Sequence, residues 1–472
     1  MKLRTQLGFA ALALYSLVIG CQPAVGVDET ITLVLEHVTI VDGTGAQPLS
    51  DGTVSLAGDR IVYAGKTSAA PRAPNAEVLD LTGRWVVPGF IDMHAHLDRG
   101  PKSEHFLSQL VAFGTTAVRA PSNPEVELRD RIASGEVVGP ELFLSGVLIN
   151  GPDSPFGQRG ETPSDYREIV AQDAARGVEF VKLYVGVPLE LARVVIEEAH
   201  RHGLGVIGHL GETTWAEAAE AGIDALTHSW YAGLIHSVVP DEYREAFRGF
   251  YIPPGADGFD ASLFRTWRQV VDVRGPEVTG LADLLVQHGI AVDPNLVLGE
   301  AVTWGDDPRA LERLEPDFAM PGQAERWRAA PHRYSSSWTD EHRAEAKLAW
   351  PLMLEIIRVF HERGVLLTVG TDYLNPWMTP GVAFHREMEL LVSAGIPPLE
   401  VLSLATRNAA EALGVAEEIG TIEEGKRADL VVLSADPLVS ISNTRSIERV
   451  FSRGQSFRPA ELLRASDEGQ HQ

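Results

Sequence analysis

The chain has 472 residues, of which 44% are hydrophobic and 22% are charged, a composition typical of globular proteins long enough for a large domain and a smaller one. The formal net charge of −25 argues against a nucleic acid or an anionic membrane surface as a partner, because both are bound through basic patches. An acidic surface mildly favours neutral or cationic small molecules instead.

The start of the chain has the features of a bacterial lipoprotein signal. Basic residues precede an apolar run of 14 residues, 7–20, which is shorter than the ~20 residues of a transmembrane helix. The run ends in Val-Ile-Gly-Cys, which resembles the lipobox, and Cys21 is the only cysteine. We expect residues 1–20 to be a removed signal peptide, Cys21 to be lipidated and residues 21–29 to be a tether. The folded part would lie in the periplasm or outside the cell, held at a membrane only by lipid; cleavage without lipidation is the alternative.

Residues 30–85 consist of short apolar runs separated by turn dipeptides such as Asp42-Gly43 and Asp51-Gly52, a pattern typical of antiparallel strands. Similar runs return only near the C-terminus, within residues 415–457. Residues 458–472 are expected to form a polar tail. The sequence therefore predicts a small β domain built from both ends of the chain.

Between these strand-rich ends, residues 86–414 alternate apolar strand patterns with amphipathic helix patterns. Helices are expected at residues 166–177, 189–203 and 215–222. Alternation of this kind predicts an α/β domain of parallel strands joined by right-handed helical crossovers.

Five of the expected barrel strands end in residues that can bind a metal. These residues are His94, His96, Lys182, His209, His228 and Asp372. If the parallel strands close into a barrel, their C-terminal ends open onto one face, where catalytic groups gather. Residues two positions apart at a strand end project to the same side, so His94 and His96 can share one divalent ion.

The segments PGFIDMHAHL and GTIEEGKRADLVVL are the most specific motifs of the chain. With the strand-end residues, they resemble the amidohydrolase superfamily of metal-dependent hydrolases, in its imidazolonepropionase-like and prolidase-like branch with a binuclear metal centre. The resemblance covers residues 31–454. It implies a (β/α)8 TIM barrel, beside which the strands from both ends of the chain pair into a small β-sandwich.

The resemblance also implies the metal centre. A buried lysine is costly unless it is paired or deprotonated; in the resembled family, the neutral amine adds CO2, so an N6-carboxylated Lys182 would bridge two divalent ions, expected to be Zn²⁺. The other ligands would be His94, His96, His209, His228 and Asp372. In the alternative reading, Lys182 forms a salt bridge and the site holds one metal.

The same resemblance implies that the protein would hydrolyse carbon–nitrogen bonds of a small amide or dipeptide-like substrate. A metal-bridging hydroxide would attack the carbonyl carbon, with Asp372 as general acid and base. Tyr231, three residues after His228, is a candidate for holding the developing oxyanion.

Several alternatives stay open. The same centre can serve an Xaa-Pro dipeptidase or a lactonase. Glu212, three residues after His209, matches the proton-shuttling glutamate of mononuclear deaminases and imidazolonepropionases of this superfamily, although those branches lack the strand-four lysine. A catalytically inactive binding lipoprotein is the remaining alternative.

The spacing of the strand ends indicates two insertions. His228 is 66 residues from Pro294, and Pro294 is 78 residues from Asp372, whereas one strand–helix unit takes roughly 30 residues. Aromatic-rich segments near 232–288 and 297–345 are therefore expected to form a lid, with Trp304 and Trp338 touching the substrate. Helices on the barrel flank, or an interface between copies of the chain in a homo-oligomer, are the alternatives.

Overall fold

The computed structural model describes residues 31–97, 102–122, 125–240, 242–243, 262–320 and 322–469. The expected signal peptide, the lipidation site Cys21 and the tether lie outside the described residues, as does part of the first insertion. Within the described ranges, no helix combines the length and the hydrophobicity that crossing a membrane requires.

The centre of the molecule is a closed barrel of parallel strands. A three-stranded sheet, β6–β7–β8, and a five-stranded sheet, β9–β10–β11–β12–β13, are joined by parallel bridges between Ser145 and Phe180 and between Ala95 and Tyr373. The predicted (β/α)8 barrel is thus confirmed. Its strands are β6 (Phe90–Asp92), β7 (Thr115–Ala120), β8 (Glu141–Leu144), β9 (Phe180–Leu183), β10 (Gly205–Gly208), β11 (Ala225–Thr227), β12 (Ala291–Asp293) and β13 (Leu366–Leu367).

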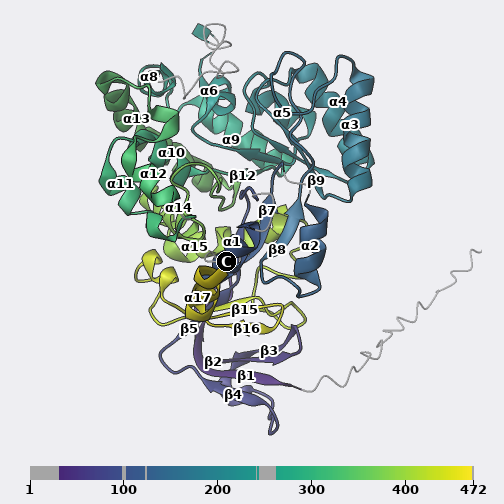
Figure 1. Ribbon diagram of the computed structural model, residues 1–472, viewed down its shortest axis with the longest axis vertical. Coiled ribbons are helices and arrows are strands. Elements are labelled where there is room, and N and C mark those ends of the chain that lie inside the picture. The colour runs from purple at the N-terminus through teal and green to yellow at the C-terminus, as the bar shows by residue number, and fades with distance from the viewer. Residues whose placement is uncertain are drawn as a thin grey trace, which may run out of the picture. The chain divides into compact units, whose positions relative to one another are not determined.

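Helices cover the outside of this barrel (Figure 1). They are α1 (Lys102–Ala112), α2 (Val126–Ala133), α3 (Pro163–Arg176), α4 (Leu189–Arg201), α5 (Trp215–Ala221), α6 (Ala232–Val238), α8 (Ser262–Gln269), α9 (Pro276–His288), α10 (Leu296–Thr303), α11 (Pro308–Glu312), α12 (Gln323–Ala329), α13 (Asp340–Arg363), α14 (Val382–Ser393), α15 (Pro398–Leu404) and α16 (Arg407–Ala412). Short 3-10 helices lie at η1 (Thr67–Ala69), η2 (Pro316–Phe318), η3 (Arg333–Ser335) and η4 (Ile441–Arg445).

Local sequence signals explain where several of these helices begin and end. Thr162 and Thr214 each form a capping box with an acidic residue three positions later, at the starts of α3 and α5. The left-handed glycines Gly177 and Gly222 end the same two helices. These signals supported the helices expected at 166–177 and 215–222.

The strands from both ends of the chain form one mixed sheet around a core of their own. In it, β5 pairs with the C-terminal strand β14, and Arg60 bridges Arg427 at the far edge. The purple and yellow strands accordingly lie side by side in Figure 1. This closure agrees with the expected β-sandwich. The strands are β1 (Leu33–Ile40), β2 (Leu49–Ala57), β3 (Arg60–Lys66), β4 (Glu77–Asp80), β5 (Trp85–Pro88), β14 (Leu430–Leu433), β15 (Ile447–Ser452) and β16 (Gln455–Phe457).

The C-terminal segment differs from the expected polar tail, because residues Pro459–Gly469 form helix α17. Its Leu462 is buried beside Val111 and Val450 in a small apolar cluster. A proline at the first helical position and this buried leucine favour a helix that packs onto α1 and β15.

Two tryptophans of the aromatic insertions pack against other rings. The Trp338 ring lies 5.2 Å from the Phe264 ring within the main apolar core, and the partly buried Trp304 ring lies 5.4 Å from the Trp350 ring against the same core. Neither side chain lines the pocket that holds His94 and Asp372, so the structure does not place them where we expected them to touch substrate. The lid stays a prediction, because part of the first insertion lies outside the described residues.

Candidate metal centre and active-site pocket

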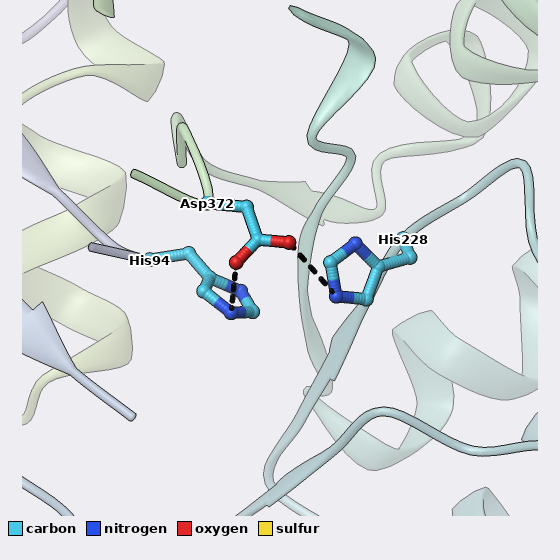
Figure 2. Close-up of side chains that lie close together, drawn as sticks. All are labelled: His94, His228 and Asp372. Carbon is cyan, nitrogen blue, oxygen red and sulfur yellow. Dashed lines mark ion pairs between the residues drawn. The ribbon is translucent and has the colours of Figure 1, made fainter. Parts of the chain in front are cut away.

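Three of the predicted ligands converge on one point at the C-terminal ends of β6, β11 and β13. Ligand atoms of His94, His228 and Asp372 all lie within 4.8 Å of one another, and all three side chains are buried (Figure 2). Asp372 Oδ1 lies 3.4 Å from His94 Nε2 and 3.0 Å from His96 Nε2, and Asp372 Oδ2 lies 3.7 Å from His228 Nε2. The first barrel strand and the last thus bring their ligands together.

His209 and Lys182 extend this cluster along β10 and β9. The His209 ring lies 4.0 Å from the His228 ring, and its Nε2 is buried without a hydrogen-bond partner. The Lys182 side chain is buried, and its Nζ is 3.4 Å from the Thr227 hydroxyl. All six residues line one pocket.

Two of these residues have strained backbones. His228 (φ 67°) and Asp372 (φ 58°) adopt the left-handed conformation, which is unfavourable for residues other than glycine. Hydrogen bonds to the backbone stabilise both strained conformations. Asn295 Oδ1 accepts a hydrogen bond from His228 N–H at 3.1 Å, and the His94 carbonyl accepts one from Asp372 N–H at 2.6 Å. Strain of this kind clusters at functional sites, where it directs side chains into the pocket.

Burial lowers the pKa values of basic side chains in the cluster, which favours the neutral forms that bind metal ions. It lowers the pKa of His94, His209 and His228 well below the usual value, so their imidazoles are neutral. It also lowers the pKa of Lys182 to about 7, so much of the amine is unprotonated at neutral pH. Neutral imidazoles bind metals, and only a neutral amine adds CO2.

These donors fit divalent metal ions. Asp372 Oδ1 lies 3.0 Å from His96 Nε2 and 3.4 Å from His94 Nε2, and His209 Nε2 is buried without a hydrogen-bond partner. A buried polar atom without a partner is costly, and a bound cation would remove that cost. Imidazole and carboxylate donors together suit Zn²⁺ among the common biological metals.

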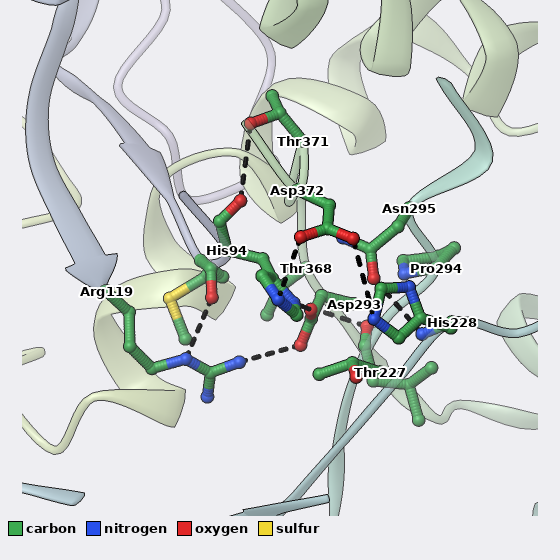
Figure 3. Close-up of polar contacts among 12 residues, drawn as sticks. His94, Arg119, Thr227, His228, Asp293, Pro294, Asn295, Thr368, Thr371 and Asp372 are labelled. Carbon is green, nitrogen blue, oxygen red and sulfur yellow. Dashed lines mark hydrogen bonds and ion pairs between the residues drawn. The ribbon is translucent and has the colours of Figure 1, made fainter. Parts of the chain in front are cut away.

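A buried carboxylate, Asp293, contacts the ligand candidate His94 on the side of the ring away from Asp372. Asp293 Oδ2 lies 2.9 Å from His94 Nδ1, and Arg119 donates to Asp293 Oδ1 at 2.7 Å and to the Met93 carbonyl at 2.8 Å (Figure 3). The Asp293 carboxylate accepts a hydrogen bond from Nδ1–H of His94, which leaves Nε2 free to bind a metal ion. We did not expect either residue from the sequence, although Asp293 ends β12 and Arg119 lies one residue before the end of β7.

Replacing Asp293 with asparagine is expected to weaken metal binding about 10- to 100-fold, the usual loss when a group that orients a ligand histidine is removed. Competition with a chromophoric chelator measures this affinity. Asp283→Asn is the matched control, because Asp283 pairs with Arg363 on the surface. Equal metal affinity in Asp293→Asn and the control would show that His94 needs no support from Asp293.

The pocket beyond the ligands is lined by uncharged side chains, and its volume is about 260 Å³. Tyr231 is among them, as expected, with its ring 5.0 Å from that of His209. The others were not expected: Ser122, Leu148, Tyr184, Trp230, Leu298, Tyr334 and Asn375. Tyr334 comes from the second insertion and donates to Asn375 Oδ1 at 2.5 Å, so this insertion does reach the pocket, through one tyrosine of η3 and Leu298 of α10.

Glu212 is not brought into this pocket. Its side chain is exposed and lines a separate hollow with Glu217 and His236. His200 and His202 also lie outside, at the end of α4, where His200 pairs with Asp224 and His202 with Glu198. The structure therefore joins seven of the eight predicted pocket residues, and Glu212 is the exception.

Comparison with known proteins agrees with this geometry. The amidohydrolase family profile matches residues 85–457. An imidazolonepropionase of Caulobacter vibrioides (strain NA1000 / CB15N) is 51% identical over 409 residues, covering 81% of this chain and 88% of that protein. Two solved structures share the fold: bottromycin amidohydrolase (TM-score 0.70, 22% identity, 92% of this chain and 90% of that one) and a Xaa-Pro dipeptidase with bound methionine (TM-score 0.64, 19% identity, 90% and 99%).

Proposed function

The chain belongs to the amidohydrolase family and is a metal-dependent hydrolase of carbon–nitrogen bonds; on that premise, we propose that it cleaves small amides or dipeptide-like compounds at a centre of two Zn²⁺ ions. The ligands are His94, His96, His209, His228, Asp372 and an N6-carboxylated Lys182. The observation that supports the proposal most strongly is that Lys182 is buried in the same pocket as Asp372 and the imidazoles of the four ligand histidines. An unmodified ammonium group there would repel the cations that the other five residues bind.

Metal ions bound there would polarise a substrate carbonyl and lower the pKa of water towards 7, which supplies a nucleophile at neutral pH. The residues of the chain do the rest. The Asp372 carboxylate, which faces the pocket between His94 and His228, accepts a proton and passes it to the leaving nitrogen as the carbon–nitrogen bond breaks. Tyr231 lies beside His209, where its hydroxyl can hold the substrate oxygen.

Imidazolonepropionase activity through one metal and Glu212 is the second candidate. The identity with the Caulobacter vibrioides imidazolonepropionase favours it. The position of Glu212 outside the pocket that holds the six ligands argues against that scheme. Whichever substrate is used, we therefore assign proton transfer to Asp372 and not to Glu212.

Two measurements on the purified protein test the proposal. Metal analysis should find two Zn²⁺ ions per chain, and removal of the metal with a chelator should abolish turnover. A panel of N-acyl amino acids, Xaa-Pro dipeptides, aryl amides and imidazolonepropionate should reveal hydrolysis of an amide class. One metal per chain, with turnover that depends on Glu212, would instead establish the second candidate.

The proposed location rests on the lipobox at Cys21. We expect Cys21→Ala to release the protein from the membrane fraction, or to stall removal of the signal peptide, because the thiol that carries the lipid is lost. Fractionation followed by immunoblotting measures both effects, with the wild-type protein as the reference. Membrane attachment that persists unchanged in the variant would rule out a lipid anchor at this residue.

A further inference from the structure

An exposed aromatic side chain contacts a tyrosine of the pocket wall. Phe156, in the loop after β8, is 46% exposed, and its ring lies 5.3 Å from the Tyr184 ring at an interplanar angle of 68°. Tyr184 lines the pocket, and its ring lies 4.7 Å from that of the proposed ligand His209. Phe156, Tyr184 and His209 thus form a row of neighbouring rings that leads from the exposed surface to the pocket.

The loop that carries Phe156 is held in place by its own contacts. Ile149 forms bridges with both Gln158 and Leu183, which tie the loop to β9. Asn150 Nδ2 donates to the Phe156 carbonyl at 3.3 Å, and the Asn150 carbonyl accepts from Tyr166 at 2.9 Å. Phe156 is thus an exposed side chain on a loop that these contacts hold in place.

A glycine sets this loop directly against the pocket wall. Gly157 has a left-handed backbone (φ +86°), and a Cβ there would lie 2.3 Å from Leu148 Cδ2. Only glycine fits this close approach, which sets the loop that carries Phe156 against Leu148, a residue of the pocket wall. We call the rings of Phe156 and Tyr184 the aromatic shelf.

We propose that the aromatic shelf is a subsite for an aromatic ring of the substrate, which lies on Phe156 and Tyr184 while the amide reaches the metal centre. The inference rests on the proposed function, because it names the substrate class of that same site. Edge-to-face and offset contacts with two aromatic side chains favour a flat apolar ring. A ring there would also cover the exposed face of Phe156, which removes apolar surface from water.

Hydroxamates test the shelf by binding alone, because they chelate metal ions and need no turnover. On the Zn²⁺-loaded protein, 3-phenylpropanohydroxamate should bind at least about tenfold tighter than acetohydroxamate, since its phenyl ring is buried. The monohydroxamate of succinic acid, of similar length but charged, should show no such gain. Calorimetry measures the three dissociation constants.

Phe156→Ala should reduce the advantage of the phenyl ligand about 3- to 10-fold and leave acetohydroxamate binding unchanged. Phe318→Ala is the matched control, because Phe318 is also exposed (37%) and stacks edge-to-face on Phe113, 5.5 Å away, but Phe113, unlike Tyr184, does not line the pocket. Both variants remove an exposed ring, so a change confined to Phe156→Ala cannot arise from general destabilisation.

Three results would overturn the shelf: equal binding of the phenyl and acetyl ligands, tighter binding of the charged ligand, or identical behaviour of Phe156→Ala and Phe318→Ala. A wrong proposal for the metal centre gives another result, namely that acetohydroxamate does not bind. If 3-phenylpropanohydroxamate still binds in that case, and its binding is weakened by Phe156→Ala, the shelf is upheld without the metal centre.

Discussion

Lys182→Ala is expected to lose bound metal and hydrolytic activity together, with activity falling at least about 100-fold. Losing a group that merely orients a ligand costs about 10- to 100-fold, and Lys182 is proposed to bind both ions itself. The substitution also removes the negative charge of the carbamate from between two cations. Metal analysis and turnover of the substrate found with the amide panel measure the two effects.

Added acetate or bicarbonate should restore part of the activity of Lys182→Ala, because a small carboxylate can occupy the space that the carbamate leaves. Lys347→Ala is the matched control: Lys347 lies on α13, pairs with Asp306 on the surface and should tolerate the change. Full activity and an unchanged metal content in Lys182→Ala would favour a site that holds one metal without the lysine.

Asp372→Asn is expected to retain the fold and much of the bound metal, while kcat falls by about 10²–10⁴-fold, the usual loss of a positioned acid and base. The amide cannot take up the proton that the carboxylate accepts, and the lost negative ligand adds to the defect. Steady-state kinetics beside metal analysis separates the two effects.

Asp306→Asn controls for the loss of a carboxylate, since Asp306 is the surface partner of Lys347. A near-normal kcat in Asp372→Asn with the metal retained would show that Asp372 is not the general acid and base. Proton transfer would then have to be assigned to another group of the pocket.

Much of the fold, and the clustering of the six strand-end residues in one pocket, could be predicted because the signals are local. Five of the expected strands carry an apolar run followed by a residue that can bind a metal, as Lys182 does near the end of β9. In a closed parallel barrel, such residues meet by topology alone. The converging cluster of Asp372, His94 and His228 followed from that rule without any knowledge of contacts.

The features that were missed depend on contacts distant in the sequence. Asp293 lies 199 positions from its partner His94, and nothing near Asp293 indicates that pairing. Trp304 and Trp338 were misjudged because aromatic content does not distinguish a side chain facing a pocket from one packed between helices. Glu212 matched a motif in spacing, but its side chain points into a different hollow.

¹³C NMR of the Zn²⁺-loaded protein prepared in ¹³C-bicarbonate tests whether Lys182 carries the proposed carbamate. We expect one carbamate resonance in the wild-type protein, absent from Lys182→Ala and lost when the metal is removed. An active, metal-loaded wild-type protein without a carbamate resonance would show that Lys182 is not carboxylated.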